Sequence, residues 1–453
     1  ALPRAERAGA ARAAHLSGRR AMLSAALGRS AVKAAAEKDS SVVRRLWQLY
    51  VNTVRPLEEL SGFHHFHLPA LTAEELEARP QVLFLGQYST GKTSMIRWLT
   101  GVDSPHFDIR PQPSTDKFVA IVHGDQETVI SGNAATCLPQ LPYQGLARFG
   151  GSFLSNFQAL VQPADILQQY SIIDTPGVLS GSKQTAGRDY EFTSVCRWMA
   201  ERSDLILLMF DAHKLDPSDE LKGVMEVLRP HRDKVRCVLN KADQIDAENL
   251  VRVYGALLWN VGQILRTPEV ARVYISSFWD EAYQYDYHQR LFDEDKENLL
   301  SELRSLPTTA VVRKINQMIL RIRLVKVHLC IASHLRSKRS VSFFGGGGKQ
   351  LKELAAGLPE LFQEVQKLRG LSVGDMPDID LFRERLLALE DMSLLPAWDK
   401  AAVDKLDHAT HVEMPRLMAS VGGVSAPDLH ARVAPQQGGL WGRLRGGRQQ
   451  GAG

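Results

Sequence analysis

A short glycine-rich segment constrains this chain most. Residues 86–93 read Gly-Gln-Tyr-Ser-Thr-Gly-Lys-Thr and fit the pattern G-x-x-x-x-G-K-[ST], between a strand-like apolar run at 82–85 and a helix-like run at 95–99. In such a turn, main-chain N–H groups and a helix N-terminus surround phosphate oxygens, while Lys92 bridges the β- and γ-phosphates and the Thr93 hydroxyl binds Mg²⁺. The sequence therefore predicts a site for a nucleoside triphosphate and Mg²⁺. Its predicted phosphate-binding residues are Gly86, Gln87, Ser89, Thr90, Gly91, Lys92, Thr93 and Ser94.

Two further motifs follow in the order that a GTPase-like domain requires. Residues 171–177 predict a strand that ends in Asp174, a carboxylate for Mg²⁺, followed by Gly177, whose N–H can reach the γ-phosphate. Residues 240–243 follow the apolar run 235–239 and have the base-reading form N-K-x-D. The predicted base-binding residues of this motif are Asn240, Lys241 and Asp243.

A proline-punctuated loop, residues 111–116, lies between the phosphate loop and Asp174. It offers Thr115 as a switch threonine that closes on Mg²⁺ and the γ-phosphate, although an ordinary turn has the same composition. The predicted catalytic residues are Lys92, Thr115, Asp174 and Gly177, and the predicted Mg²⁺ ligands are Thr93, Thr115 and Asp174.

The middle of the chain alternates strand and helix patterns, as a doubly wound α/β sheet does. The motifs follow the predicted strands, where ligands bind in open α/β sheets. We therefore predict a P-loop nucleotide-binding domain with a mostly parallel sheet over residues 77–300. Its predicted strands are 81–85, 118–122, 171–174, 205–210, 235–239 and 273–276.

Beyond residue 301 the apolar period becomes helical. The later of these helical stripes is expected to be interrupted near Gly357. An amphipathic stretch at 41–60 is expected to pack on the helices beyond residue 301. We predict an all-α domain assembled from 41–76 and 301–420. The apolar stripes are Ile315, Met318, Ile319, Ile322, Val325, Leu329, Ala332 and Leu335, then Leu351, Leu354, Leu358, Leu361, Val365 and Leu368.

The two ends of the chain differ in composition from the rest. Residues 1–40 are rich in Ala and Arg, which fits either an organellar transit peptide or a low-complexity extension, and we predict disorder there. Residues 421–453 are rich in Gly and Arg and predict a disordered tail.

The chain has four scattered cysteines without a C-x-x-C motif, which favours reduced thiols in a cytosolic protein. It has no apolar run of about 18 residues, so we expect membrane contact to be peripheral.

Residues 336–349 join two predicted long helices and combine adjacent phenylalanines with glycines and basic residues. Composition leaves two alternatives open. One is a membrane-contacting tip, in which basic side chains meet anionic lipids and apolar ones insert; the other is a solvated charge cluster with the phenylalanines folded back on the helices. The residues concerned are Arg336, Lys338, Arg339, Val341, Phe343, Phe344, Lys349 and Lys352.

Five segments together resemble the EHD family, the EH-domain-containing, dynamin-like ATPases that remodel membranes in endocytic traffic. They are residues 86–93, 173–181, 211–216, 238–245 and 252–259. The resemblance implies a dynamin-like fold and Mg-ATP as substrate. It also implies slow hydrolysis stimulated by assembly, and a homodimer and higher oligomers on anionic membranes that contain phosphatidylserine or phosphoinositides.

The resemblance also implies roles for single residues. Trp279 is similar to the family's base-pocket aromatic residue, Trp259 to its dimer-anchoring tryptophan, and the 336–352 segment to its membrane-binding tip. It implies a cytoplasmic protein, peripheral on endosomal or plasma membranes. The segment Phe63–His67 resembles a linker of the family; its own residues favour a packed aromatic turn over a metal site.

Some features depart from the family or leave alternatives open. The chain has no D-x-[DN]-x-[DN]-G loop, so we expect no EH-type recognition of Asn-Pro-Phe peptides. We also expect no nucleic-acid partner. As generic chemistry, Asp243 favours guanine, so a GTP-specific dynamin- or septin-like GTPase remains the alternative. A nucleotide-gated membrane scaffold with negligible hydrolysis is another. Val178 follows Gly177 where small GTPases place a water-orienting Gln, which predicts slow hydrolysis.

Overall fold

The computed structural model describes residues 41–102, 104, 117–178, 190–214, 217–266, 272–279, 281–338, 347–389 and 395–421. These residues form two compact units. The first holds the described part of Ala78–Ala310, and the second holds the described parts of Glu37–Glu77 and Val311–Gly453. The long helix α12, Gln289–Ser337, contributes residues to both units.

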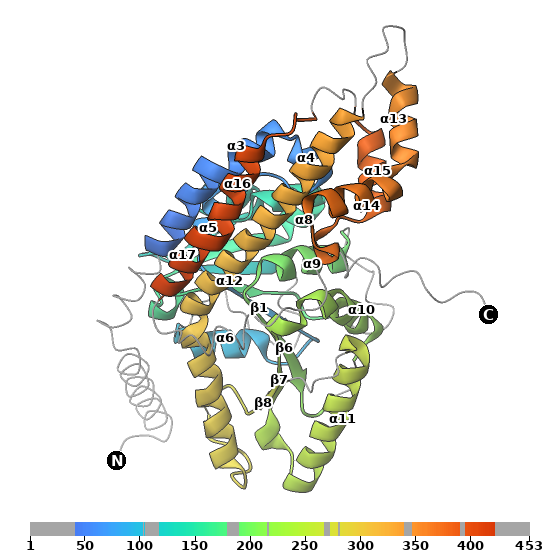
Figure 1. The fold of residues 1–453 in the computed structure, drawn as a ribbon. Coiled ribbons are helices and arrows are strands. Elements are labelled where there is room, and N and C mark those ends of the chain that lie inside the picture. Colours follow the sequence, from blue (N-terminus) through green and yellow to red (C-terminus); the bar gives the residue numbers. More distant parts are fainter. Residues whose placement is uncertain are drawn as a thin grey trace, which may run out of the picture. The chain divides into compact units, whose positions relative to one another are not determined.

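An eight-stranded sheet forms the centre of the first unit, in the order β3-β4-β2-β5-β1-β6-β7-β8. Figure 1 labels β1, β6, β7 and β8 of this sheet. The pairs β2/β5 and β3/β4 are antiparallel, and the other neighbours are parallel. The predicted doubly wound, mostly parallel α/β fold is confirmed, and all six predicted strands are present to within one residue at each end. The strands are β1 Gln81–Gly86, β2 Phe118–His123, β3 Thr128–Ser131, β4 Phe157–Gln162, β5 Ser171–Asp174, β6 Leu205–Asp211, β7 Val235–Asn240 and β8 Val273–Ile275.

The sequence did not predict strands β3 and β4. β3 has four residues at the edge of the sheet, and most of its side chains are exposed. β4 carries Gln158 and Gln162, which interrupt its apolar run. β4 pairs with both β2 and β3, so cross-strand contacts stabilise it where the local pattern is weak.

The apolar side chains of the central strands divide between the two faces of the sheet. In β1, Leu83 and Leu85 lie in one core and Val82 and Phe84 in the other, because successive side chains of a strand point to opposite faces. Burial on both faces explains the nearly continuous apolar sequence of β1 and β6. Helices complete the first unit: α6 Lys92–Thr100, α7 Gly132–Cys137, α8 Gly150–Ser155, α9 Phe192–Arg202, α10 Asp219–Leu228 and α11 Ala247–Leu265.

The described part of the second unit is helical. Val42 and Leu46 share one core with Ile315 and Ile322 of α12, so the expected packing of the 41–60 stretch on the α12 stripe is confirmed. No described helix is both long and apolar enough to cross a bilayer. The elements are a helix at 41–49, η1 Tyr50–Val54, α3 Arg55–Leu60, α4 Phe63–Phe66, α5 Ala73–Glu77, α13 Gly347–Ala356, α14 Leu358–Arg369, α15 Ile379–Leu387, α16 Lys400–His408, η9 Ala409–Glu413 and α17 Met414–Ser420, with Gly357 separating α13 from α14.

A buried ion pair joins α3 to α12 within the second unit. Arg321 donates through Nε to Glu58 Oε1 at 2.5 Å and through Nη2 to Glu58 Oε2 at 3.0 Å, and both side chains are buried. The Tyr50 hydroxyl donates to the same carboxylate at 2.8 Å, and burial together with this bond raises the pKa of Tyr50 to about 12. Since an unpaired charge in the interior is costly, this cluster favours one arrangement of the 41–77 segment on α12.

The segment Phe63–His67 packs as an aromatic turn, as its own residues favoured. Phe66 is buried and stacks on Phe382 with ring centroids 4.6 Å apart. The His67 ring lies edge-on to that of His328, and His67 Nε2 is 3.1 Å from His328 Nδ1. Burial lowers the pKa of both histidines, that of His328 to about 4. The pair is therefore neutral at physiological pH.

Candidate nucleotide site

The phosphate loop connects β1 to α6 and depends on two glycines. A Cβ at Gly86 would lie 2.5 Å from a main-chain oxygen of β6, and one at Gly91, where φ is 86°, would lie 2.4 Å from Asn240 Nδ2. Only glycine fits such close approaches. Lys92 Nζ donates to the carbonyl oxygens of Gly86 and Gln87, both at 3.1 Å, so its charge is held over the loop. Ser89 and Thr90 belong to the same loop, and Ser94 lies in the first turn of α6.

The two predicted Mg²⁺ ligands that the structure describes are in contact. Thr93 Oγ1 donates to Asp174 Oδ2 at 2.8 Å. Asp174 is the last residue of β5 and is buried, which raises its pKa, while Lys92 and the Thr93 bond act in the opposite direction. Among the described residues, Asp174 Oδ1 has no hydrogen-bond partner. A carboxylate and a hydroxyl beside a phosphate loop are oxygen donors that suit Mg²⁺, so these residues fit the ion.

The segment after Asp174 is attached to the phosphate loop by main-chain hydrogen bonds. The Tyr88 N–H donates to the Val178 carbonyl at 3.0 Å, and the Val178 N–H donates to the Gly86 carbonyl at 3.1 Å. A Cβ on Gly177 would lie 2.7 Å from Tyr88 Cα, so glycine is required there. Asp174, Gly177 and the phosphate loop are therefore neighbours. The predicted switch residue Thr115 lies outside the described residues.

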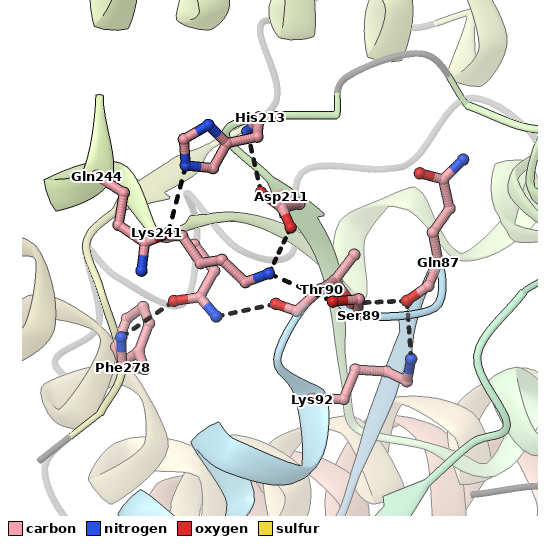
Figure 2. A network of polar contacts seen from close by, with 10 residues as sticks. Gln87, Ser89, Thr90, Lys92, Asp211, His213, Lys241, Gln244 and Phe278 are labelled. Atoms are coloured by element: carbon pink, nitrogen blue, oxygen red, sulfur yellow. Dashed lines mark hydrogen bonds and ion pairs between the residues drawn. The ribbon is translucent and has the colours of Figure 1, made fainter. Parts of the chain in front are cut away.

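Asn240 links the phosphate loop to the loop that follows β8. Its Nδ2 donates to the Thr90 carbonyl at 2.9 Å, and its Oδ1 accepts from the Phe278 N–H at 3.0 Å. Both contacts are drawn in Figure 2. Phe278 is a core residue against Trp98, whereas Trp279, the predicted base-pocket residue, is half-buried. The N-K-x-D motif and the aromatic segment thus meet at one place.

Lys241 belongs to a polar network at the rim of this site (Figure 2). It has a φ of 61°, and its Nζ lies 2.5 Å from Asp211 Oδ2. The other Asp211 oxygen accepts from the His213 N–H at 2.9 Å, and His213 Nε2 is 3.3 Å from Gln244 Oε1. The sequence predictions assigned no site role to Asp211, His213 or Gln244. One sequence feature could have identified Asp211 and His213: both lie within one of the segments that resemble the EHD family.

Asp243 is buried, with no exposed surface. Its Oδ1 accepts from the Ser277 hydroxyl, and its Oδ2 accepts from the Gln284 N–H at 2.9 Å. Both oxygens of the motif's carboxylate are therefore paired within the chain. The sequence motif gave no sign of either donor, because both come from residues more than thirty positions away.

Other predicted site residues lie apart from the motifs in sequence. Trp259 is 68% exposed on α11. At the predicted tip, Arg336 Nη1 donates to the Leu395 carbonyl at 2.7 Å, and Lys338 Nζ donates to Glu364 Oε1 at 3.0 Å, whereas Lys352 is exposed. Arg339, Val341, Phe343, Phe344 and the side chain of Lys349 lie outside the described residues.

Three family models match the chain. They describe an N-terminal segment of EH-domain-containing proteins at residues 45–77, a 50S ribosome-binding GTPase at residues 81–241, and a domain of unknown function at residues 309–418. The second match covers the phosphate loop, Asp174 and the first half of the N-K-x-D motif. It identifies the central part of the chain as a P-loop NTPase domain.

Two human proteins are similar to most of the chain. EH domain-containing protein 1 is 45% identical over 381 residues, which make up 84% of this chain and 71% of that protein. EH domain-containing protein 3 is 43% identical over 381 residues, with the same coverage. Among solved structures, one described as an oligomerised bacterial dynamin pair is 12% identical, with a TM-score of 0.35 over 86% of this chain and 79% of that one.

Proposed function

Because the chain belongs to the family of EH domain-containing proteins, we propose that it is a dynamin-like ATPase that binds Mg-ATP and remodels anionic membranes in endocytic and recycling traffic. It carries a P-loop NTPase domain. The proposed enzyme works as a dimer and higher oligomer, peripherally bound to the cytoplasmic face of endosomal or plasma membranes. Its hydrolysis is slow until subunits assemble.

The hydrogen bond between Thr93 and Asp174 is the observation that supports this function most directly. It places the hydroxyl of the phosphate loop against the carboxylate at the end of β5, and these are the two groups that would hold Mg²⁺ in a P-loop NTPase. Bound Mg²⁺ would offset charge on the phosphate oxygens. Lys92, now on two loop carbonyls, would transfer its hydrogen bonds to phosphate oxygens, and the Gly177 N–H would meet the γ-phosphate.

We propose adenine as the base. A GTPase of this class uses the aspartate of N-K-x-D to accept from the imino and amino groups of guanine. Here Asp243 is buried and already accepts two hydrogen bonds from its own chain. Adenine presents no such pair of donors and does not need that carboxylate. Trp279, half-buried beside Phe278, would supply the aromatic surface against the base.

Two observations support slow hydrolysis that depends on assembly. Val178 occupies the place of a water-orienting side chain, and its N–H is bonded to the Gly86 carbonyl. When a partner subunit positions the attacking water and stabilises charge on the γ-phosphate, the rate of hydrolysis can rise by several orders of magnitude. Trp259 on α11 is 68% exposed, and Val251 on the same helix is 71% exposed. A large exposed aromatic residue suits the anchor of a dimer interface.

The membrane proposal concerns residues 336–352, from the end of α12 into α13. Arg336 and Lys338 have partners within the second unit. We therefore propose that Arg339, Lys349 and Lys352 provide most of the attraction to anionic lipids. Insertion into the bilayer is assigned to Val341, Phe343 and Phe344. The Lys338–Glu364 pair is half-exposed on both sides. Such a surface pair is weak, so Lys338 keeps the ability to turn towards a lipid phosphate.

Calorimetric titration with non-hydrolysable ATP and GTP analogues in the presence of Mg²⁺ tests the nucleotide assignment. We expect ATP binding that is lost in Lys92→Ala, since this change removes the phosphate-clamping charge. Binding of GTP alone would identify a dynamin- or septin-like GTPase instead. A phosphate-release assay with and without liposomes then separates an assembly-stimulated ATPase from a scaffold with negligible hydrolysis.

A further inference from the structure

We propose that the second unit holds a binding site of its own, for a small phosphorylated polyol. The site is a cavity of about 360 Å³ between the helical segment 45–53 and residues 413–417. This volume lies near the lower end of the range for small-molecule sites, about 300–1,000 Å³. The cavity therefore suits one sugar phosphate or inositol phosphate. The inference goes beyond the proposed ATPase function and does not depend on it.

The two leucines that line the cavity belong to the core of the second unit. Leu49 is half-buried and Leu417 is buried, and both pack in the same apolar cluster, so they form the floor of the cavity. Leu49 lies on a helical stripe in which apolar residues would close the seam between two packed helices. Here most of that stripe is polar, and the seam stays open above the leucines. The stripe consists of Arg45, Gln48, Leu49, Asn52 and Thr53.

Both walls of the cavity contain π-helical turns. In η1 the Arg55 N–H donates to the Tyr50 carbonyl, five residues earlier, and η9 has the same pattern. Asn52 and Thr53 of η1 line one wall, and Glu413 of η9 lines the other. π-helical turns are rare in proteins and are frequent at functional sites. Two of them beside one cavity favour a ligand site over a simple gap in helix packing.

The charges at the cavity fit one phosphate group. Arg416 Nη1 donates to Glu413 Oε1 at 3.1 Å, so these two charges form a pair. Arg45 is exposed and makes no hydrogen bond or ion pair with another described residue. Because a guanidinium can bind two phosphate oxygens at once, Arg45 is the anchor for a phosphate monoester. A second phosphate would bring further negative charge close to Glu413, which favours a monophosphate.

The remaining polar groups suit hydroxyls. The side chains of Gln48 and Asn52 are exposed and have no hydrogen-bond partner among the described residues. Their amides both donate and accept, as does the Thr53 hydroxyl, and the Glu413 carboxylate accepts. Since the hydroxyls of a polyol also donate and accept, a phosphorylated polyol matches these groups better than inorganic phosphate does.

The two ends of the chain are poor alternatives as occupants of this cavity. Residues 1–40 and residues 421–453 each contain more Lys and Arg than Asp and Glu. Their net charge has the same sign as the unpaired Arg45. An anionic ligand is therefore the better complement.

Calorimetry with myo-inositol 1-phosphate tests the proposal on the whole chain. We expect it to bind more tightly than myo-inositol or inorganic phosphate, because each of these lacks one part of the contacts. Arg45→Met should lower the affinity about tenfold or more, the effect of a lost charge-assisted hydrogen bond. Arg44→Met is the matched control: this adjacent arginine is also exposed but does not line the cavity, so it should keep the parent's affinity.

A further variant tests the hydroxyl-binding side of the cavity. Asn52→Ala should lower the affinity for inositol 1-phosphate about threefold to tenfold and leave that for inorganic phosphate unchanged. This variant decides the question if Arg45→Met does not fold. Folding is checked for each variant by circular dichroism and melting temperature.

Vesicles distinguish two sources of this chemistry, a soluble phosphate and a lipid headgroup. They are added to a Phe343→Ala, Phe344→Ala double variant, which lacks the proposed insertion at the tip. If vesicles that contain phosphatidylinositol 4-phosphate displace inositol 1-phosphate, the ligand is a lipid headgroup. If they do not, it is soluble.

The outcomes separate this inference from the proposed function. Lys92→Ala should bind inositol 1-phosphate like the parent, so loss of the nucleotide assignment leaves the inference standing. A folded parent that does not bind inositol 1-phosphate overturns it. Equal affinities in folded Arg45→Met and Arg44→Met overturn it as well.

Discussion

The side-chain amide of Asn240 donates to the main-chain carbonyl of Thr90 at 2.9 Å, although the two residues are 150 positions apart. Its carbonyl oxygen accepts from the Phe278 N–H. One buried side chain therefore connects the phosphate loop to the segment that carries Trp279. In this chain the asparagine of the N-K-x-D motif acts as a brace between the two halves of the nucleotide site.

Asn240→Ala should weaken the binding of ATP and of GTP to a similar extent. The change removes two hydrogen bonds and leaves a carbonyl and an N–H without partners, so we expect affinity to fall about tenfold or more. Calorimetry with ATP and GTP analogues measures this. Asn156→Ala, which removes a half-buried side-chain amide that donates to the Ser152 carbonyl, is the control. Selective loss of one nucleotide would contradict a bracing role.

Phe343 and Phe344 should be required for membrane binding. Replacing both with Ala deletes inserted apolar area, and we expect affinity for phosphatidylserine- or phosphoinositide-containing vesicles to fall about tenfold or more in sedimentation assays. A variant with Leu at both positions keeps most of the apolar area and should still pellet. If the Ala variant pellets like the parent, the tip is not the membrane surface.

Trp259→Ala should weaken dimerisation strongly while the protein remains folded. Truncation of an interface anchor costs about 2 kcal/mol or more, which corresponds to about a thirtyfold weaker dimer. Analytical ultracentrifugation measures the dimer, and ATP turnover on liposomes should lose its rise with protein concentration. Val251→Ala, on the same helix and equally exposed, should have a smaller effect. Rapid turnover in dilute, lipid-free solution would contradict catalysis that depends on assembly.

Arg321→Met should destabilise the protein far more than a surface substitution. It leaves Glu58 buried without its guanidinium partner, and the expected loss is about 3–5 kcal/mol in urea unfolding. Adding Glu58→Leu should recover part of that loss, because the unpaired charge is then gone. Arg55→Met removes an exposed pair with Glu59 and should cost less than about 1 kcal/mol. If Arg321→Met and Arg55→Met lower the free energy of unfolding equally, burial of the Arg321–Glu58 pair does not have the expected effect on stability.

Stability should fall as the pH is lowered from about 6.5 to about 4. The folded pKa of His328 is lowered by burial from 6.5 to about 4, so the unfolded chain takes up a proton first. The stability from neutral His328 is therefore complete above pH 6.5 and is lost towards pH 4, by an amount on the order of 3 kcal/mol. His67, whose pKa burial also lowers, acts in the same direction.

A variant series isolates that effect from other titrating groups. Unfolding by urea at several pH values should show a shallower pH dependence for His328→Gln than for the parent. His411→Gln, an exposed histidine on η9, is the control and should follow the parent. Parallel curves for the parent and His328→Gln would contradict the assignment.

The sequence by itself determined the α/β sheet and the order of its nucleotide motifs. Strands buried on both faces, such as β1 and β6, must be almost continuously apolar, so they are visible without any knowledge of their partners. Since polar motifs cannot lie inside such strands, they fall at the strand ends. The contact between Thr93 and Asp174 follows from that rule.

Only the tertiary structure decided how the individual groups are used. It paired Asp243 with Ser277 and Gln284, Arg336 with Leu395, and Lys338 with Glu364, and it added β3 and β4 to the sheet. The physical reason is the range of the interactions. Apolar periodicity acts locally and is written in consecutive residues, whereas a hydrogen bond or an ion pair needs two groups whose separation along the chain leaves no mark on either local sequence.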